Sequence, residues 1–119
     1  MDIRTRRIYE HGDHDDGQPL LVDRLWPRGI ARAALANVPW LKDIAPSTQL
    51  RNWFGHQPAK WAEFRRRYFV ELDANPEALA ELRAHAGRGR VILLYAARDE
   101  AHNNAIALRD YLLAHAGKS

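Results

Sequence analysis

The sequence contains no cysteine. Disulfide bonds, thiolate nucleophiles and cysteine-ligated zinc sites are therefore excluded, and a reducing compartment is compatible with the chain. No apolar run approaches the roughly 20 residues that a helix needs to cross a bilayer. The first residues, Met1–Arg4, also lack the apolar segment of a signal peptide. We therefore expect a cytoplasmic protein without a membrane partner.

The motifs that bind nucleotide phosphates are missing as well. The chain has neither a P-loop nor a GxGxxG sequence, and Ser47 is not part of a nucleophile elbow. We therefore expect no cofactor. Lysine and arginine number 18 against 15 aspartates and glutamates, a mild excess that permits an anionic partner but does not require nucleic acid.

One loop is rich in residues that can bind metals, but its spacing argues against a metal site. The pattern does not fit a calcium loop, and two histidines without a third anchor make a weak zinc site. We interpret the loop as turn chemistry and predict no metal. The residues concerned are His11, Asp13, His14, Asp15 and Asp16.

The stretch from Val91 to Leu108 organises the chain. Val91–Tyr95 is a continuous apolar run, which is typical of a strand buried on both faces of a parallel sheet. Apolar residues then recur at helical spacing from Ala105 to Leu112. Between these two patterns, residues 98–104 are mostly polar. Because ligands of open α/β sheets bind beyond the carboxyl ends of strands, we expect a site here.

The rest of the chain supplies two further strands and several helices. We predict an edge strand over Ile3–Tyr9 and a buried strand over Leu20–Val22, and the short loop between them favours an antiparallel pair. Proline, glycine and serine positions, together with apolar spacing, mark helices at residues 31–37, 48–54, 58–74 and 76–85. Ser47 should cap the helix at 48–54, and Gly55 should end it.

These elements predict one α/β domain over residues 1–119, the size of a typical domain. A small central sheet of three to four strands, with the last strand in the centre, should carry helices packed on it in a Rossmann-like layered architecture. If the second and third strands are parallel neighbours, the residues that follow them meet at one edge.

The first group at this predicted edge follows the second strand. Asp23 and Arg24 form either a structural ion pair or an acid/base carboxylate beside an anion-binding guanidinium. Arg28 lies close by in the sequence, after a proline that stops strand pairing. Trp26 is either a core residue or a substrate platform.

The second group follows the third strand. Arg98, Asp99 and His102 combine a guanidinium, a carboxylate and an imidazole, while Asn103 and Asn104 either cap the next helix or bind the amide edge of a ligand. From the predicted helix at 48–54 and its end, Arg51, Trp53 and His56 would close the crevice.

Three functions fit this pattern. In the first, the protein is an enzyme acting on a small anionic substrate, nucleotide-like or phosphorylated. Asp23 or Asp99 is then the base, His102 or His56 the proton partner, and the arginines bind the anion. In the second, Trp61 and the basic run Arg65–Arg67 bind nucleic acid without catalysis. A solvated run paired with Glu63 and Glu71 explains the same charges. In the third, the protein is a regulatory subunit whose polar cluster is only architecture.

A set of segments spread over nearly the whole chain matches a known family pattern. These segments are Arg7–Tyr9, Leu21–Gly29, Trp40–Ser47, Leu50-Arg51, Trp53–His56, Tyr68, Glu71-Leu72, Leu93–Ala96, Asp99 and His102–Ala105. On them the chain resembles the YeaO-like family of small bacterial proteins, a domain of unknown function, although Gln18-Pro19 and Arg32 depart from the usual residues. The resemblance implies a compact cytoplasmic α/β domain and no established activity, cofactor or substrate.

Overall fold

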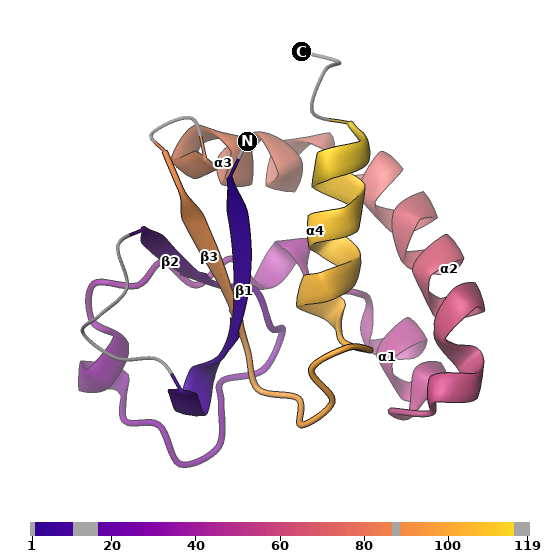
Figure 1. Cartoon of the computed structure of the whole chain (residues 1–119), viewed down its shortest axis with the longest axis horizontal. Coiled ribbons are helices and arrows are strands. Elements are labelled where there is room, and N and C mark those ends of the chain that lie inside the picture. Colours follow the sequence, from indigo (N-terminus) through magenta and orange to yellow (C-terminus); the bar gives the residue numbers. More distant parts are fainter. Residues whose placement is uncertain (1, 11–16, 87–88, 116–119) are drawn as a thin grey trace.

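The computed structural model describes residues 2–10, 17–86 and 89–115. The strands are β1 (Ile3–Arg7), β2 (Gln18–Leu21) and β3 (Val91–Tyr95). The α-helices are α1 (Thr48–Phe54), α2 (Trp61–Asp73), α3 (Pro76–Ala86) and α4 (Asn104–Ala114). Short 3-10 helices cover Ile8–Glu10, Arg32–Leu35, Lys42–Ile44 and Pro58–Lys60. The expected α/β fold is therefore confirmed (Figure 1).

The three strands form one parallel sheet in the order β1-β3-β2. Ile3 and Gln18 both stand opposite Val91, each on its own side of β3. The prediction of a central last strand is confirmed, whereas the predicted antiparallel pairing of the first two strands is wrong. The ten residues from 8 to 17 can span up to roughly 33 Å when extended. A connection of this length can join parallel strands on either side of β3, so the short loop does not require an antiparallel pair.

The side chains of β3 alternate between two apolar clusters. Val91, Leu93 and Tyr95 pack against the four α-helices, while Ile92 and Leu94 face the opposite side of the sheet. Figure 1 shows α4 lying along the sheet with α2 beside it. Every residue of β3 is buried, so the continuous apolar run reflects packing on both faces of the strand.

The second face of the sheet is covered by irregular chain rather than by an α-helix. The segment that follows β2 folds back over it, and the 3-10 helix Arg32–Leu35 replaces the helix predicted at residues 31–37. Trp26 and Trp40 pack there edge to face, with 5.3 Å between the ring centroids. Large aromatic side chains thus supply on this face the apolar area that a helix would otherwise bury.

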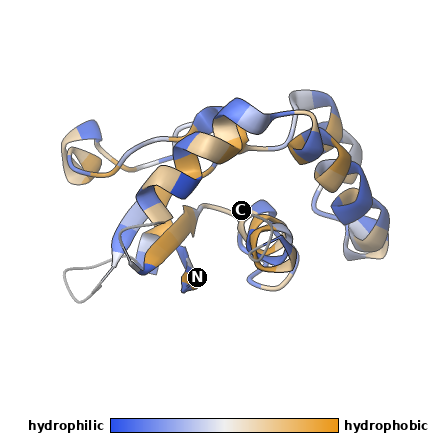
Figure 2. Ribbon diagram, turned by 90° about the horizontal axis from the view of Figure 1, so that it is seen from above, coloured by the Kyte–Doolittle hydropathy of each residue, from blue (hydrophilic) through white to orange (hydrophobic). Residues whose placement is uncertain are grey.

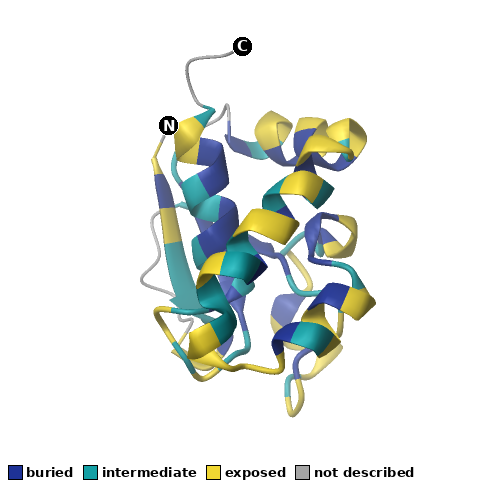
Figure 3. Cartoon of the chain, turned by 90° about the vertical axis from the view of Figure 1, so that its right-hand side faces the viewer, coloured by how far each residue is buried: buried dark blue, intermediate teal, exposed yellow. Residues whose placement is uncertain are grey.

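The helices present one apolar side to the core. In α2, Phe64, Tyr68 and Leu72 are buried as their spacing predicts, and Trp61 is partly buried. The Tyr68 hydroxyl donates to the carbonyl of Ile44 at 2.6 Å. Figures 2 and 3 show apolar, buried positions interleaved with polar, exposed positions along the helices. Among the described residues, no helix is long and apolar enough to cross a membrane.

Helix α1 has the predicted ends. The Ser47 hydroxyl accepts a hydrogen bond from the backbone N–H of Leu50 at 3.1 Å, and Gly55 adopts a left-handed conformation with φ of 55°. The Glu71 carboxylate accepts bonds from the Ser47 backbone N–H at 2.8 Å and from its hydroxyl at 2.6 Å. Glu71 therefore fixes the start of α1, and the prediction that it pairs with the Arg65–Arg67 run is wrong.

Ser47→Ala removes the cap and the hydroxyl bond to Glu71. We expect the free energy of unfolding to fall by about 1–2 kcal/mol, measured by urea denaturation. Thr48→Ala is the matched control, because Thr48 is exposed at the first helical position. Equal stability of the two variants would contradict the role assigned to Ser47.

Candidate functional site

The carboxyl ends of all three parallel strands open into one pocket of about 710 Å³. Tyr9 lies beyond β1, residues 23–28 follow β2, and residues 96–99 and 102–104 follow β3 and begin α4. The remaining lining residues are Ala45, Pro46, Arg51, Phe54, His56 and Phe64. The two polar groups predicted to meet at one edge of the sheet therefore do so.

The carboxylate of Asp23 joins the ends of β2 and β3. One oxygen accepts the backbone N–H of Ala96 at 2.9 Å, and the other accepts the side-chain amide of Asn104 at 3.1 Å. The same amide nitrogen donates to the carbonyl of Val22 at 3.0 Å. One aspartate thus holds the end of a strand, the start of the following loop and the first residue of α4.

Burial raises the pKa of Asp23, and the bonds from Asn104 and Ala96 and the charge of Arg51 oppose this shift. The ion pair considered for Asp23 and Arg24 is not formed. Arg24 instead donates from Nε to the carbonyl of Pro46 at 3.0 Å and from Nη2 to that of Ala45 at 3.1 Å. Its guanidinium has no carboxylate partner among the described residues and keeps its positive charge in the pocket wall.

Asp99 orders the turn before α4. Its Oδ1 accepts the backbone N–H groups of Ala101 and His102, each at 2.9 Å, and its Oδ2 lies 2.9 Å from Nδ1 of His102. The Ala101 bond first, and then the His102 contact, lower the pKa of Asp99. This carboxylate is ionised at neutral pH and holds the imidazole in one orientation.

The two asparagines that follow have different roles. Asn103 is buried and caps α4, because its Oδ1 accepts the N–H of Ile106 at 2.9 Å and its amide donates to the carbonyl of Asp99 at 2.9 Å. The predicted capping role of Asn103 is therefore observed. Asn104, by contrast, links α4 to β2 through Asp23 and Val22.

His102 lies between Asp99 and the aromatic side chains of α2. Its ring meets Trp61 edge-on, with 5.3 Å between the centroids. Since Nδ1 faces Asp99, Nε2 is the nitrogen left for other contacts, and within the described residues it has no hydrogen-bond partner. The other histidine of the pocket, His56, has a φ of 57° directly after Gly55. These two left-handed residues turn the chain at the end of α1.

Three exposed arginines lie around the pocket without a carboxylate partner among the described residues. They are Arg28, Arg51 and Arg98. With Arg24, the pocket carries four guanidiniums against two carboxylates, those of Asp23 and Asp99. The positive charge predicted for this edge of the sheet is therefore present in excess over the acidic groups of the pocket, and the charge of Arg51 also acts on Asp23.

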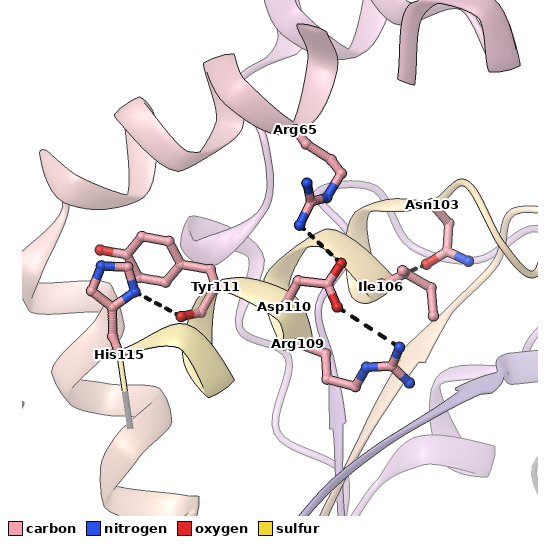
Figure 4. Close-up of polar contacts among 7 residues, drawn as sticks. All are labelled: Arg65, Asn103, Ile106, Arg109, Asp110, Tyr111 and His115. Atoms are coloured by element: carbon pink, nitrogen blue, oxygen red, sulfur yellow. Dashed lines mark hydrogen bonds and ion pairs between the residues drawn. The ribbon is translucent and has the colours of Figure 1, made fainter. Parts of the chain in front are cut away.

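The basic run on α2 differs in this respect. Arg65 pairs with Asp110 at 3.1 Å (Figure 4), while Arg66 and Arg67 both pair with Glu63 at 2.7 and 2.8 Å. These two arginines lower the pKa of Glu63 to about 2. Each of the three guanidiniums thus has a carboxylate neighbour, as the structural interpretation of this run predicts.

The structure leaves one predicted site residue outside the pocket and adds others. Trp53 packs beneath the cations of Arg67 and Lys60, at 4.2 and 5.0 Å from its ring centroid, and does not line the cavity. The reasoning from sequence missed Tyr9, whose hydroxyl donates to the carbonyl of Arg28 at 2.8 Å. Tyr9 lies just beyond an edge strand. The rule that ligands of open α/β sheets bind beyond the carboxyl ends of strands, here called the strand-end rule, could therefore have identified it.

The described residues contain no group of three or more histidine or acidic side chains that could hold a metal ion. The loop of residues 11–16, where such side chains are concentrated in the sequence, lies outside the described residues. The prediction that this loop is turn chemistry without a metal therefore stays a prediction.

Comparison with known proteins decides the family. A family model described as "Inactive DUF488-N3 subclade" matches residues 2–119. The chain belongs to this family. It is also 39% identical over 112 residues to the uncharacterized protein YeaO of Escherichia coli, covering 94% of this chain and 97% of YeaO. The predicted YeaO-like membership is thereby confirmed.

Mycobacterial relatives of this DUF488-N3 member are more similar still. Uncharacterized proteins of Mycobacterium tuberculosis (Rv3073c) and Mycobacterium bovis (Mb3100c) are each 46% identical to it over 110 residues, covering 92% of both chains. No solved structure matches the chain significantly. The comparisons thus give the family, while the names of these relatives give no activity.

The lowered pKa of Asp99 predicts a pH dependence with a definite sign. The folded state favours the ionised carboxylate, so this stabilisation is present above the unfolded value near 3.8 and is lost as pH falls through the lower folded value. Asp99→Asn should be less stable than the parent at pH 7, and the gap should shrink in strong acid. Urea denaturation at both pH values checks this, and a gap that widens in acid would contradict it.

Proposed function

We propose that the pocket binds a small phosphorylated molecule and that this protein does not convert it. The observation that carries the proposal is the set of four guanidiniums around one cavity, none paired with a carboxylate among the described residues. Arginine binds phosphate through parallel, charge-assisted hydrogen bonds. The cavity volume of about 710 Å³ lies in the range of sites for nucleotide-sized ligands.

Arg24 is the best-oriented of these cations. Its two bonds to the carbonyls of Pro46 and Ala45 hold the guanidinium in the half-buried wall, so little side-chain entropy is lost on binding. Attraction between opposite charges is stronger in a partly buried site than in bulk water. Arg28, Arg51 and Arg98 would add contacts at the exposed mouth.

The carboxylates favour binding over catalysis. Asp23 and Asp99 each accept hydrogen bonds that maintain the fold of the pocket, so both carboxylates already have an architectural role. The family description, which names an inactive subclade, agrees with a pocket that has kept its ligand but lost its chemistry. A cytoplasmic, ligand-responsive regulatory role is the biological setting that we propose.

An enzyme remains the second candidate, and His102 is the reason. Its Nδ1 faces Asp99, an arrangement that fixes the ring and leaves Nε2 for a ligand. Mass spectrometry after long incubation with a bound ligand separates the two functions. Accumulation of product with the parent protein and its loss in His102→Gln would favour the enzyme, whereas an intact ligand in both favours the binding domain.

A screen for thermal stabilisation by sugar phosphates, nucleoside monophosphates and pyrophosphate tests the proposal. A bound anion should raise the melting temperature, and Arg51→Ala should weaken its binding about tenfold, as expected for one charge-assisted contact. Arg66→Ala is the matched control, since Arg66 pairs with Glu63 away from the pocket.

Two outcomes would contradict the proposal. One is that no phosphorylated compound raises the melting temperature of the parent. The other is that Arg51→Ala and Arg66→Ala weaken binding equally, because the anion would then be held by general surface charge.

A further inference from the structure

The pocket has an exposed cationic mouth and a less exposed inner wall. Arg28, Arg51 and Arg98 are exposed, whereas Asp23 and Asn104 are half-buried. The two zones have opposite chemistry, because guanidiniums only donate hydrogen bonds and carboxylate oxygens only accept them. A ligand that suits both zones carries its phosphate at the mouth and its hydrogen-bond donors inside.

The inner wall contains hydrogen-bond acceptors that contacts within the fold do not fully use. Within the described residues each Asp23 oxygen accepts one hydrogen bond, from Ala96 or from Asn104, although a carboxylate oxygen can accept two. The amide nitrogen of Asn104 is already bonded to Val22 and Asp23. The side-chain carbonyl oxygen of Asn104 accepts from no donor in the described part of the chain. The Asp23 carboxylate and this oxygen are therefore neighbouring acceptors that can bind hydrogen-bond donors of a ligand.

A second feature of the inner wall is a pair of stacked aromatic rings. Phe54 and Phe64 both line the pocket and are buried, with centroids 4.4 Å apart and an interplanar angle of 26°. Trp61 stacks on Phe64 at 5.7 Å and meets His102 edge-on. The two phenyl rings stack on one another and are nearly fully buried, so they give the inner wall an apolar edge against which part of a base can pack.

We propose that the ligand is a guanine nucleotide, with its base against Asp23 and Asn104 and its phosphate among the arginines at the mouth. This inference rests on the proposed function and names its ligand. Guanine presents two adjacent donors, the ring N1–H and the exocyclic amino group, which match neighbouring acceptors.

Adenine and hypoxanthine match these acceptors less well than guanine does. Adenine replaces the N1–H donor by an acceptor that would face the Asp23 carboxylate. Hypoxanthine keeps N1–H but lacks the amino group. A site built around hydrogen-bond partners discriminates strongly against analogues that leave those partners unpaired. Guanosine monophosphate should therefore bind most tightly, inosine monophosphate less tightly and adenosine monophosphate least. The dissociation constants of the first and the last should differ at least tenfold.

The inference is tested by isothermal titration of the whole parent protein with these three nucleotides and with guanosine, which has no phosphate. This comparison needs no variant that could disturb the fold. Arg98→Ala should weaken all three nucleotides by a similar factor and keep their order, since it changes only the mouth. Arg83→Ala on α3 is the control, because it is exposed and lies outside the pocket.

The outcomes separate this inference from the proposed function. The predicted order, with guanosine bound much more weakly than its monophosphate, supports both. Equal affinity for the three nucleotides, or a preference for the adenine nucleotide, overturns the base assignment and leaves anion binding intact. Guanosine binding as tightly as its monophosphate overturns the anion-binding function. No binding of any of these four compounds overturns the guanine assignment, while the anion-binding function is decided by the screen with sugar phosphates and pyrophosphate.

Discussion

The hydrogen bonds of the Asp23 carboxylate are the interaction on which the site depends. They tie the end of β2 to the loop after β3 and to the first residue of α4, partners 73 and 81 positions away in the sequence. The parallel sheet brings these segments to one edge, and the carboxylate fixes their spacing. Because a buried carboxylate without partners is strongly disfavoured, the bonds to Ala96 and Asn104 are also what allow Asp23 to lie there.

The acidic and basic side chains at this edge of the sheet have different roles. Acidic side chains at this edge are bonded to backbone N–H groups and maintain the architecture, while the guanidiniums are held by carbonyls or exposed to solvent. The opposite holds on α2, where arginines and acids pair with one another. Positive charge is therefore available to a ligand at the pocket, and this contrast makes the pocket the better candidate for anion binding.

Much of this arrangement follows from local patterns in the sequence. The apolar run of β3, the cap at Ser47 and the left-handed Gly55 each depend on neighbouring residues, so they could be predicted. The strand-end rule also placed Asp23 and Asp99 at one edge. Local reasoning failed where partners are distant: Arg24 is the nearest cation to Asp23 in sequence, yet the partners of Asp23 lie just after β3 and at the start of α4. The antiparallel prediction failed similarly, because β3 inserts between strands that are close in the chain.

A double-mutant cycle on Asp23→Ala and Asn104→Ala, measured by urea denaturation, tests the central claim most directly. If the Asp23 carboxylate and the Asn104 amide connect β2 to α4, the two substitutions should be non-additive, with a coupling free energy of about 1–2 kcal/mol. Losses of stability that add within a few tenths of a kcal/mol would show that the contact does not hold these elements together, and the account of the pocket would be contradicted.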